Sequence, residues 1–96
     1  MKVAIYSQKS DLDTFLYLSK FVSELEKRGV QAILNEEMAN SMQFSKEFET
    51  FAGKEDLKEK KVDLFFTFGG DGTIVTSLLF IQDLEIPVVG VNTGRL

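Results

Sequence analysis

One short run of residues carries the strongest chemical signal in this sequence, Gly69-Gly70-Asp71-Gly72-Thr73. Glycines between a strand and a helix let the main chain take unusual dihedral angles and let a ligand approach it closely. The amide groups at the start of the following helix would then point outward, which is an arrangement that binds anions. The run therefore predicts a ligand that carries phosphate.

Asp71 changes what this phosphate site can do. A carboxylate beside phosphates is repelled unless Mg²⁺, a hydrogen-bonding hydroxyl or a proton to be abstracted lies between them. An acid among anion-binding amides therefore favours phosphoryl transfer to a hydroxyl, or metal-bridged nucleotide binding. The alternative is that Asp71 only caps the helix, as a lone Asp often does. Thr73 likewise is either a hydroxyl donor to phosphate or an ordinary residue of the first helical turn.

Other phosphate-binding motifs do not fit this run. A P-loop requires Gly-Lys followed by Ser or Thr, and no such triplet follows the glycines. A dinucleotide fingerprint that used Gly70 and Gly72 would need a third glycine where the sequence has Val75. Hydride transfer with a nicotinamide cofactor is therefore disfavoured.

A second cluster of turn residues covers positions 90–94. Its polar side chains, Asn92 and Thr93, could hydrogen-bond a ligand across a cleft from Asp71. The alternative is an ordinary turn, because Asn, Thr and Gly are common turn formers. We expect the two clusters to act together if the fold places them at one edge of a sheet.

The elements that would position these residues alternate between strand and helix. Apolar runs predict strands over 2–6, 30–34, 62–68 and 86–91, and hydrophobic periodicity predicts helices over 12–28 and 73–82. This alternation indicates an α/β fold, an open three-layer sandwich with a mainly parallel sheet and helices on both faces. Ligands of such sheets bind beyond the carboxyl ends of the strands, where both glycine turns should lie on one edge.

Three local expectations accompany this fold. The first helix should begin at a capping box formed by Ser10 and Asp13 and end at Gly29 in a left-handed conformation. The charge-rich segment 35–61 should be a solvated, mobile, partly helical insert with a helix between about 43 and 60. The helix over 73–82 should be buried, since apolar residues dominate it.

Composition narrows the class of protein. The chain has 96 residues, 44% of them hydrophobic, which suits one domain. A net charge of −4 argues against a generally basic nucleic-acid or anionic-membrane surface, and the absence of Cys and His excludes disulfides, thiol nucleophiles and His/Cys metal sites. The sequence shows neither a signal-peptide layout nor an apolar run long enough to span a bilayer, so we expect a soluble intracellular protein. The last strand has no following helix to cover it, so we expect the chain to be part of a longer protein.

Several polar residues are assigned ordinary roles. The segment 7–10 lies at the end of the first strand and could contact a nucleotide, but a loop and helix cap explain it better. Glu36 and Glu37 could bind a metal, but a solvated acidic pair is commoner, and no metal-ligating residue is assigned. Arg95 could meet a phosphate, but its type alone does not assign it a site.

At these motifs the sequence resembles the NAD kinase family. The run at 69–73 resembles that family's signature, although diacylglycerol, sphingosine and 6-phosphofructokinase relatives share its wider pattern. The segment Gly90-Val91-Asn92-Thr93-Gly94-Arg95-Leu96 resembles the family's next motif and makes the likeness more specific. The resemblance covers essentially the whole chain as an N-terminal α/β nucleotide-binding domain, residues 1–96, with the family's β-rich C-terminal domain absent.

The resemblance implies an enzyme that transfers phosphate from ATP to the adenosine ribose 2′-hydroxyl of NAD. Some members use polyphosphate, and a divalent cation such as Mg²⁺ is expected. Asp71 would be the general base, and the nucleotide contacts would be Gly70, Asp71, Gly72, Thr73, Asn92 and Thr93.

With the charge and hydropathy given above, we expect a cytoplasmic protein that binds small nucleotides and neither nucleic acid nor membrane. The full-length protein should be a homo-oligomer, and this chain alone should be inactive because it lacks the family's downstream Asn-Glu motif. The alternatives are a lipid or sugar kinase of the same superfamily, or a non-catalytic nucleotide-binding module.

Overall fold

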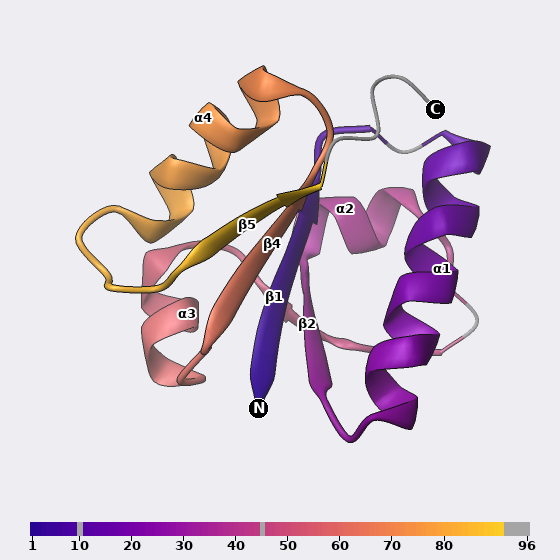
Figure 1. Cartoon of the computed structure of the whole chain (residues 1–96), viewed down its shortest axis with the longest axis horizontal. Coiled ribbons are helices and arrows are strands. Elements are labelled where there is room, and N and C mark those ends of the chain that lie inside the picture. The colour runs from indigo at the N-terminus through magenta and orange to yellow at the C-terminus, as the bar shows by residue number, and fades with distance from the viewer. Residues whose placement is uncertain (10, 45, 92–96) are drawn as a thin grey trace.

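The computed structural model describes residues 1–9, 11–44 and 46–91, apart from the side chain of Asp71. Five strands form one parallel sheet in the order β3-β2-β1-β4-β5 (Figure 1). The elements in chain order are β1 (Lys2–Ser7), α1 (Leu12–Lys27), β2 (Gln31–Asn35), α2 (Glu36–Ser41), β3 (Glu49–Phe51), α3 (Lys54–Glu59), β4 (Leu64–Phe68), α4 (Asp71–Ile81) and β5 (Val88–Val91). The predicted α/β sandwich is confirmed.

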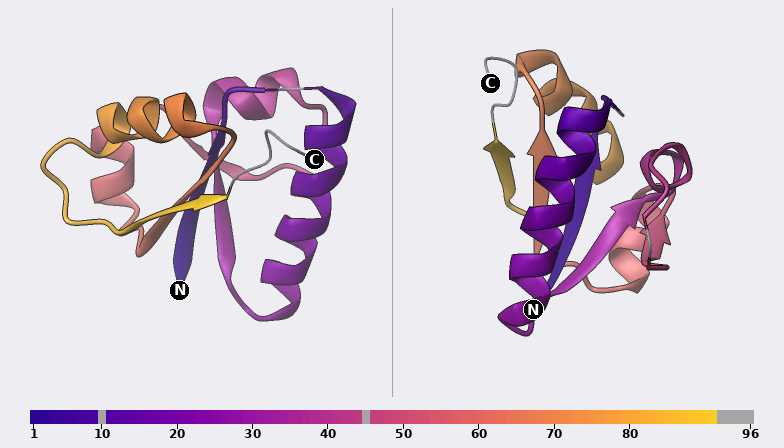
Figure 2. Two further views of the ribbon diagram at one scale, coloured as in Figure 1. Left: turned by 45° about the horizontal axis from the view of Figure 1, so that its top comes forward. Right: turned by 90° about the vertical axis from the view of Figure 1, so that its right-hand side faces the viewer.

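Helices cover both faces of the sheet, with α1 and α2 on one side and α3 and α4 on the other (Figures 1 and 2). Alternate side chains of the central strand β1 enter two separate cores, because successive residues of a strand point to opposite faces. Val3 and Ile5 pack on the α1 side, whereas Ala4 and Tyr6 pack on the α3 and α4 side. The near-continuous apolar run of β1 is what a strand buried on both faces requires.

Helix α1 begins at Leu12, as predicted, but its capping residue is one position later than expected. The capping residue is Asp11, whose carboxylate accepts a hydrogen bond of 2.9 Å from the backbone N–H of Thr14. The predicted cap Ser10 lies outside the described residues. Gly29 has a φ of +75°, which confirms the predicted left-handed stop after the helix.

Segment 35–61 is partly helical, as expected, but the predicted helix over 43–60 was wrong. The segment forms α2, the edge strand β3 and α3 rather than one helix over 43–60, and β3 adds a fifth strand beside β2. Its apolar residues belong to the cores, since Met38, Met42, Phe51 and Leu57 are all buried. Their spacing looks irregular in the sequence because the two methionines serve one face of the sheet and the other two residues serve the opposite face.

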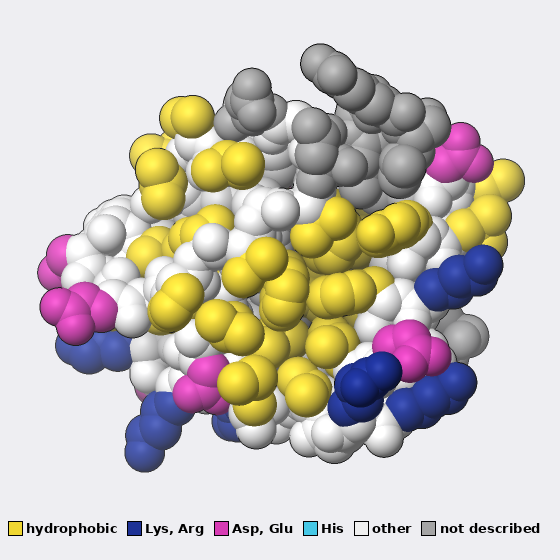
Figure 3. All heavy atoms as spheres, viewed as in Figure 1, with side chains coloured by type: hydrophobic (Ala, Val, Ile, Leu, Met, Phe, Trp, Pro, Cys, Tyr) yellow, Lys and Arg dark blue, Asp and Glu magenta, His cyan; other side chains and the backbone are white. Residues whose placement is uncertain are grey.

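Helix α4 also differs from the expectation, because most of its large apolar side chains are exposed. Val75 is 66% exposed and Leu79 is 70% exposed, while Ser77 is fully buried against the sheet. Figure 3 shows hydrophobic side chains gathered on the face that contains β5. The helix packs on β4 through the buried residues Thr73 and Ser77, so its apolar composition does not translate into burial. No described helix combines the length and apolarity that crossing a membrane requires.

Candidate functional site

The glycine turn lies at the carboxyl end of β4, as predicted. Phe68 pairs with Val91, so the parallel strands β4 and β5 end at the same edge of the sheet. The backbone N–H of Gly69 donates a hydrogen bond of 3.0 Å to the carbonyl of Val91 and ties the turn to β5. This register places Gly90 and Val91, the described start of the second cluster, beside the end of β4, where the glycine turn begins.

Gly69 is required by the packing inside the turn. Its φ is +147°, a conformation that residues with a side chain rarely adopt. A Cβ atom at this position would lie 2.4 Å from Oγ1 of Thr73, which is closer than real contacts allow. Gly69 therefore serves the fold of the turn.

Gly70 and Gly72 meet a different requirement. A Cβ atom built on either residue would find no atom within 4 Å, so the space above the main chain is open. Gly70 caps α4, and its carbonyl accepts a hydrogen bond of 3.0 Å from the N–H of Thr73. The Thr73 amide is thus already bonded, and the other amides of the first turn remain the candidates for an anion.

Thr73 faces the sheet in this structure. Its side chain is 6% exposed, and its hydroxyl donates a hydrogen bond of 3.1 Å to Oε1 of Gln8. The Nε2 group of Gln8 donates a second bond of 2.9 Å to Oγ1 of Thr76. Donation from Thr73 to phosphate stays a prediction, and it would require the bond to Gln8 to break.

Gln8 is the residue whose role the sequence did not reveal. Two hydrogen bonds make it a bridge between the carboxyl end of β1 and the first turns of α4. Its sequence neighbours suggested only a loop. The signal that could have identified it is the strand order, because β1 lies directly beside β4 and brings the ends of both strands together.

A buried hydroxyl network fixes α4 on β4 beneath the turn. Oγ of Ser77 lies 2.8 Å from Oγ1 of Thr67 and 2.8 Å from the carbonyl oxygen of Thr73. Ser77 and Thr67 are both buried. Hydroxyls buried in this way need partners, so the network sets where the helix begins relative to the strand.

Replacing Ser77 with Ala should lower the free energy of unfolding by about 1–3 kcal/mol. Thr67 loses the closer of its two hydrogen-bonding partners in the core and keeps only a bond of 3.5 Å to the carbonyl of Thr73. Urea denaturation followed by circular dichroism measures this change. The matched control is Ser23→Ala, since Ser23 is exposed on α1. Equal effects of the two substitutions would show that the network contributes nothing.

Three predicted site residues cannot be placed. The side chain of Asp71 and all of Asn92 and Thr93 lie outside the described residues, although the backbone of Asp71 begins α4. Their assigned roles therefore stay predictions. The described part of the site consists of the open glycine turn, the Thr73–Gln8–Thr76 bridge and the hydroxyl network below it.

The sequence of this chain matches a known protein family over most of its length. The family model described as the ATP-NAD kinase N-terminal domain matches residues 8–96. The chain belongs to the NAD kinase family. The match includes the glycine turn and Gln8, the residue that bridges β1 to α4.

Individual proteins that resemble this chain are also NAD kinases. The chain is 35% identical over 100 residues to the NAD kinase of Christiangramia forsetii and 36% identical over 101 residues to that of Cytophaga hutchinsonii, covering 100% of this chain and 34% of each relative. A crystal structure of yeast NADH kinase complexed with NADH has the same fold, with a TM-score of 0.75 and 22% sequence identity. The superposition covers 100% of this chain and 32% of the yeast chain. The chain spans about a third of the length of these relatives.

The metal expected for this family has no ready-made cage in the described part of the chain. Among those residues, no three His, Cys, Asp or Glu side chains gather to hold an ion. Mg²⁺ is usually held by one or two carboxylates together with substrate phosphates, so its donor set is completed by the nucleotide.

Proposed function

We propose that this chain is the N-terminal nucleotide-binding domain of an NAD kinase, residues 1–96, which works with a β-rich C-terminal domain. The reaction would be phosphorylation of the adenosine ribose 2′-hydroxyl of NAD by ATP. The observation that carries the proposal is the glycine turn at the carboxyl end of β4, open above Gly70 and Gly72, in a chain of this family. The C-terminal domain, the cytoplasmic location and homo-oligomeric assembly belong to the same proposal.

The chemistry assigns different tasks to the two sides of the turn. Asp71 would accept the proton of the 2′-hydroxyl while that oxygen attacks the γ-phosphorus of ATP and the bond to the ADP oxygen breaks. The products are NADP, ADP and one proton. The open main chain at Gly70 and Gly72 would admit the phosphates, and a divalent cation bound with ATP would offset their charge.

The neighbouring residues would complete the site. Asn92 and Thr93 follow the end of β5 and would form a second wall for NAD. Thr73 is proposed to contribute mainly by holding the turn against Gln8, with which it is hydrogen-bonded. Because Gln8 also bonds Thr76, this bridge would keep the first two turns of α4 in place when the nucleotide binds.

The test is formation of NADP by the full-length gene product supplied with NAD, ATP and Mg²⁺. We expect NADP to appear at a rate proportional to enzyme concentration. Parallel assays with diacylglycerol and fructose 6-phosphate distinguish the other kinases of the superfamily. Phosphorylation of either lipid or sugar in place of NAD would contradict the proposal, and binding of NAD without turnover would indicate a nucleotide-binding module.

A further inference from the structure

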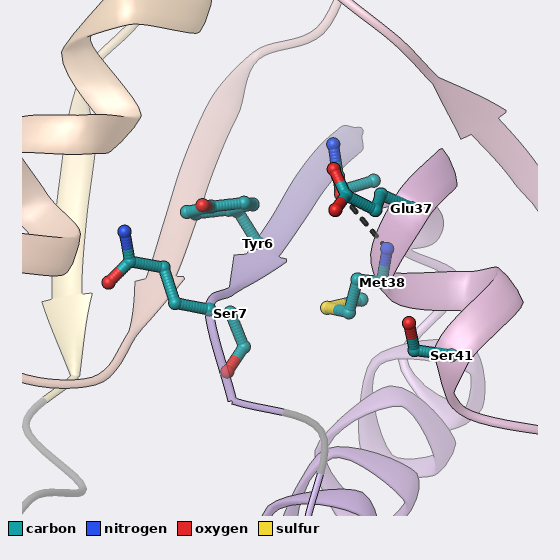
Figure 4. Close-up of a pocket in the computed structure, with 7 residues that line it drawn as sticks. Tyr6, Ser7, Glu37, Met38 and Ser41 are labelled. Atoms are coloured by element: carbon teal, nitrogen blue, oxygen red, sulfur yellow. Dashed lines mark hydrogen bonds between the residues drawn. The ribbon is translucent and has the colours of Figure 1, made fainter.

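A polar cleft of about 270 Å³ lies at the carboxyl ends of β1 and β2, and β1 is the strand next to β4, which ends at the glycine turn. Figure 4 shows Tyr6 and Ser7 of β1 on one side and Glu37, Met38 and Ser41 of α2 on the other. Its full lining is Tyr6, Ser7, Gln8, Asn35, Glu37, Met38 and Ser41. Ligand pockets usually measure about 300–1,000 Å³, so this cleft suits one part of a nucleotide rather than all of it.

The walls of the cleft are held by hydrogen bonds within the chain. Oδ1 of Asn35 accepts a bond of 3.0 Å from the backbone N–H of Met38, and the Ser7 hydroxyl donates one of 3.1 Å to the carbonyl of Lys9. Asn35 and Ser7 are each 5% exposed. The cleft is therefore formed before a ligand arrives.

The charge of the cleft selects the kind of group it can hold. Glu37 is the charged residue of the lining, and within the described residues its carboxylate forms no hydrogen bond or ion pair. Burial raises the pKa of Tyr6, and the nearby charge of Glu37 adds to this, whereas a hydrogen bond with Gln8 opposes it. Because the net shift is upward, the phenol keeps its proton and can donate a hydrogen bond. A negative, hydroxyl-lined cleft repels phosphate and favours a neutral group with several hydroxyls.

Gln8 joins this cleft to the glycine turn. It lines the cleft, and its side chain is bonded to Thr73 and Thr76 at the start of α4. Because β1 lies between β2 and β4, the ends of those two strands are about 10 Å apart. A nucleotide can therefore place its sugar in the cleft and its phosphates at the turn.

We propose that this cleft binds the ribose of the phosphoryl donor, with the vicinal hydroxyls of that ribose donating hydrogen bonds to the carboxylate of Glu37. The inference rests on the proposed function, in which the acceptor hydroxyl of NAD lies at Asp71. Asp71 follows β4, so β1 separates it from β2 and the far side of this cleft. A carboxylate near a strand end plays the same part toward ribose in dinucleotide-binding folds. The donor is then a nucleoside triphosphate, since inorganic polyphosphate has no ribose to fill the cleft.

The first test compares Glu37→Gln with Glu36→Gln in the full-length protein. Glu36 is the neighbouring exposed acid of α2 and does not line the cleft, so its variant is the matched control. We expect Glu37→Gln to raise KM for ATP about 10- to 100-fold, as loss of a hydrogen bond to a charged group would, and to leave KM for NAD unchanged. Wild type should discriminate against 3′-deoxy-ATP, and Glu37→Gln should lose that discrimination.

The second test measures binding without turnover. The full-length protein labelled with ¹⁵N is titrated with ATP and separately with inorganic tripolyphosphate. We expect ATP to shift the amide resonances of Tyr6 and Glu37, and tripolyphosphate to shift those of the glycine turn alone. Absence of NADP formation would contradict the proposed function. The titration would still test the cleft, because it measures ATP binding and does not depend on turnover. Equal effects of Glu37→Gln and Glu36→Gln, or no ATP shift at Tyr6 and Glu37, would overturn the inference.

Discussion

Replacing Asp71 with Asn in the full-length protein is expected to lower kcat for NADP formation by about 100- to 10,000-fold, the range that general-base catalysis supplies. Asparagine keeps the size and polarity of the side chain but cannot accept the proton of the ribose hydroxyl. The fold should persist, because hydrogen bonds among Ser77, Thr67 and Thr73 hold α4 on β4. Initial rates at saturating NAD and ATP measure the loss, and circular dichroism checks the fold.

Asp83→Asn is the matched control for this substitution. Asp83 follows the opposite end of α4, is exposed, and forms an ion pair with Lys54. The same chemical change at that end should leave kcat within a factor of two or so, because exposed ion pairs contribute little. Turnover of Asp71→Asn close to that of the wild type would refute the assignment of Asp71 as the base.

The strand and helix order could be predicted because each main element of the sheet carries a local signal. The strand β1 is a short apolar run, α1 repeats its apolar residues with helical spacing, and Gly29 marks the helix end. Right-handed crossovers then place helices on both faces of the sheet, as the two separate cores show. These features depend on residues that are near one another in the chain.

The errors lie where distant contacts decide the structure. Strand β3 has three residues, too few for a periodic signal, and it exists because it pairs with β2. Helix α4 is rich in apolar residues, yet it packs on β4 through Thr73 and Ser77 and leaves Val75 and Leu79 exposed to solvent. Composition reports how hydrophobic a helix is, but which face is covered depends on its neighbours in the sheet.

The site itself was only partly visible in the sequence. The glycine turn is a contiguous motif, and its position at the end of β4 confirms the expectation. Gln8 and Glu37 are single polar residues in segments that were assigned ordinary roles, and they gain significance only when the sheet brings three strand ends together. Pairwise hydrogen bonds across 65 residues, such as that between Thr73 and Gln8, have no local signature.

Replacing Gly69 with Ala should lower the free energy of unfolding by about 2–5 kcal/mol, the largest effect on stability expected for any residue of the turn. The backbone at φ +147° disfavours a side chain, and the new Cβ would lie 2.4 Å from Oγ1 of Thr73. Relief of that contact would move the Thr73 hydroxyl away from Gln8 and break their hydrogen bond. Urea denaturation measures the change.

Gly72→Ala separates folding from binding in the same turn. Alanine is favoured over glycine inside a helix by about 1 kcal/mol, and the added Cβ meets no atom within 4 Å, so this variant should be as stable as wild type or more so. The same methyl group occupies the open space through which phosphates would approach the main chain, so nucleotide binding should weaken about tenfold or more. Unchanged ATP and NAD affinity in a stable Gly72→Ala variant would mean that the ligand does not approach the turn here.

Full stability of Gly69→Ala would mean that the turn can relax around Thr73. If Gly69→Ala loses stability and Gly72→Ala loses nucleotide affinity, then Gly69 shapes the turn and Gly72 leaves room for the ligand.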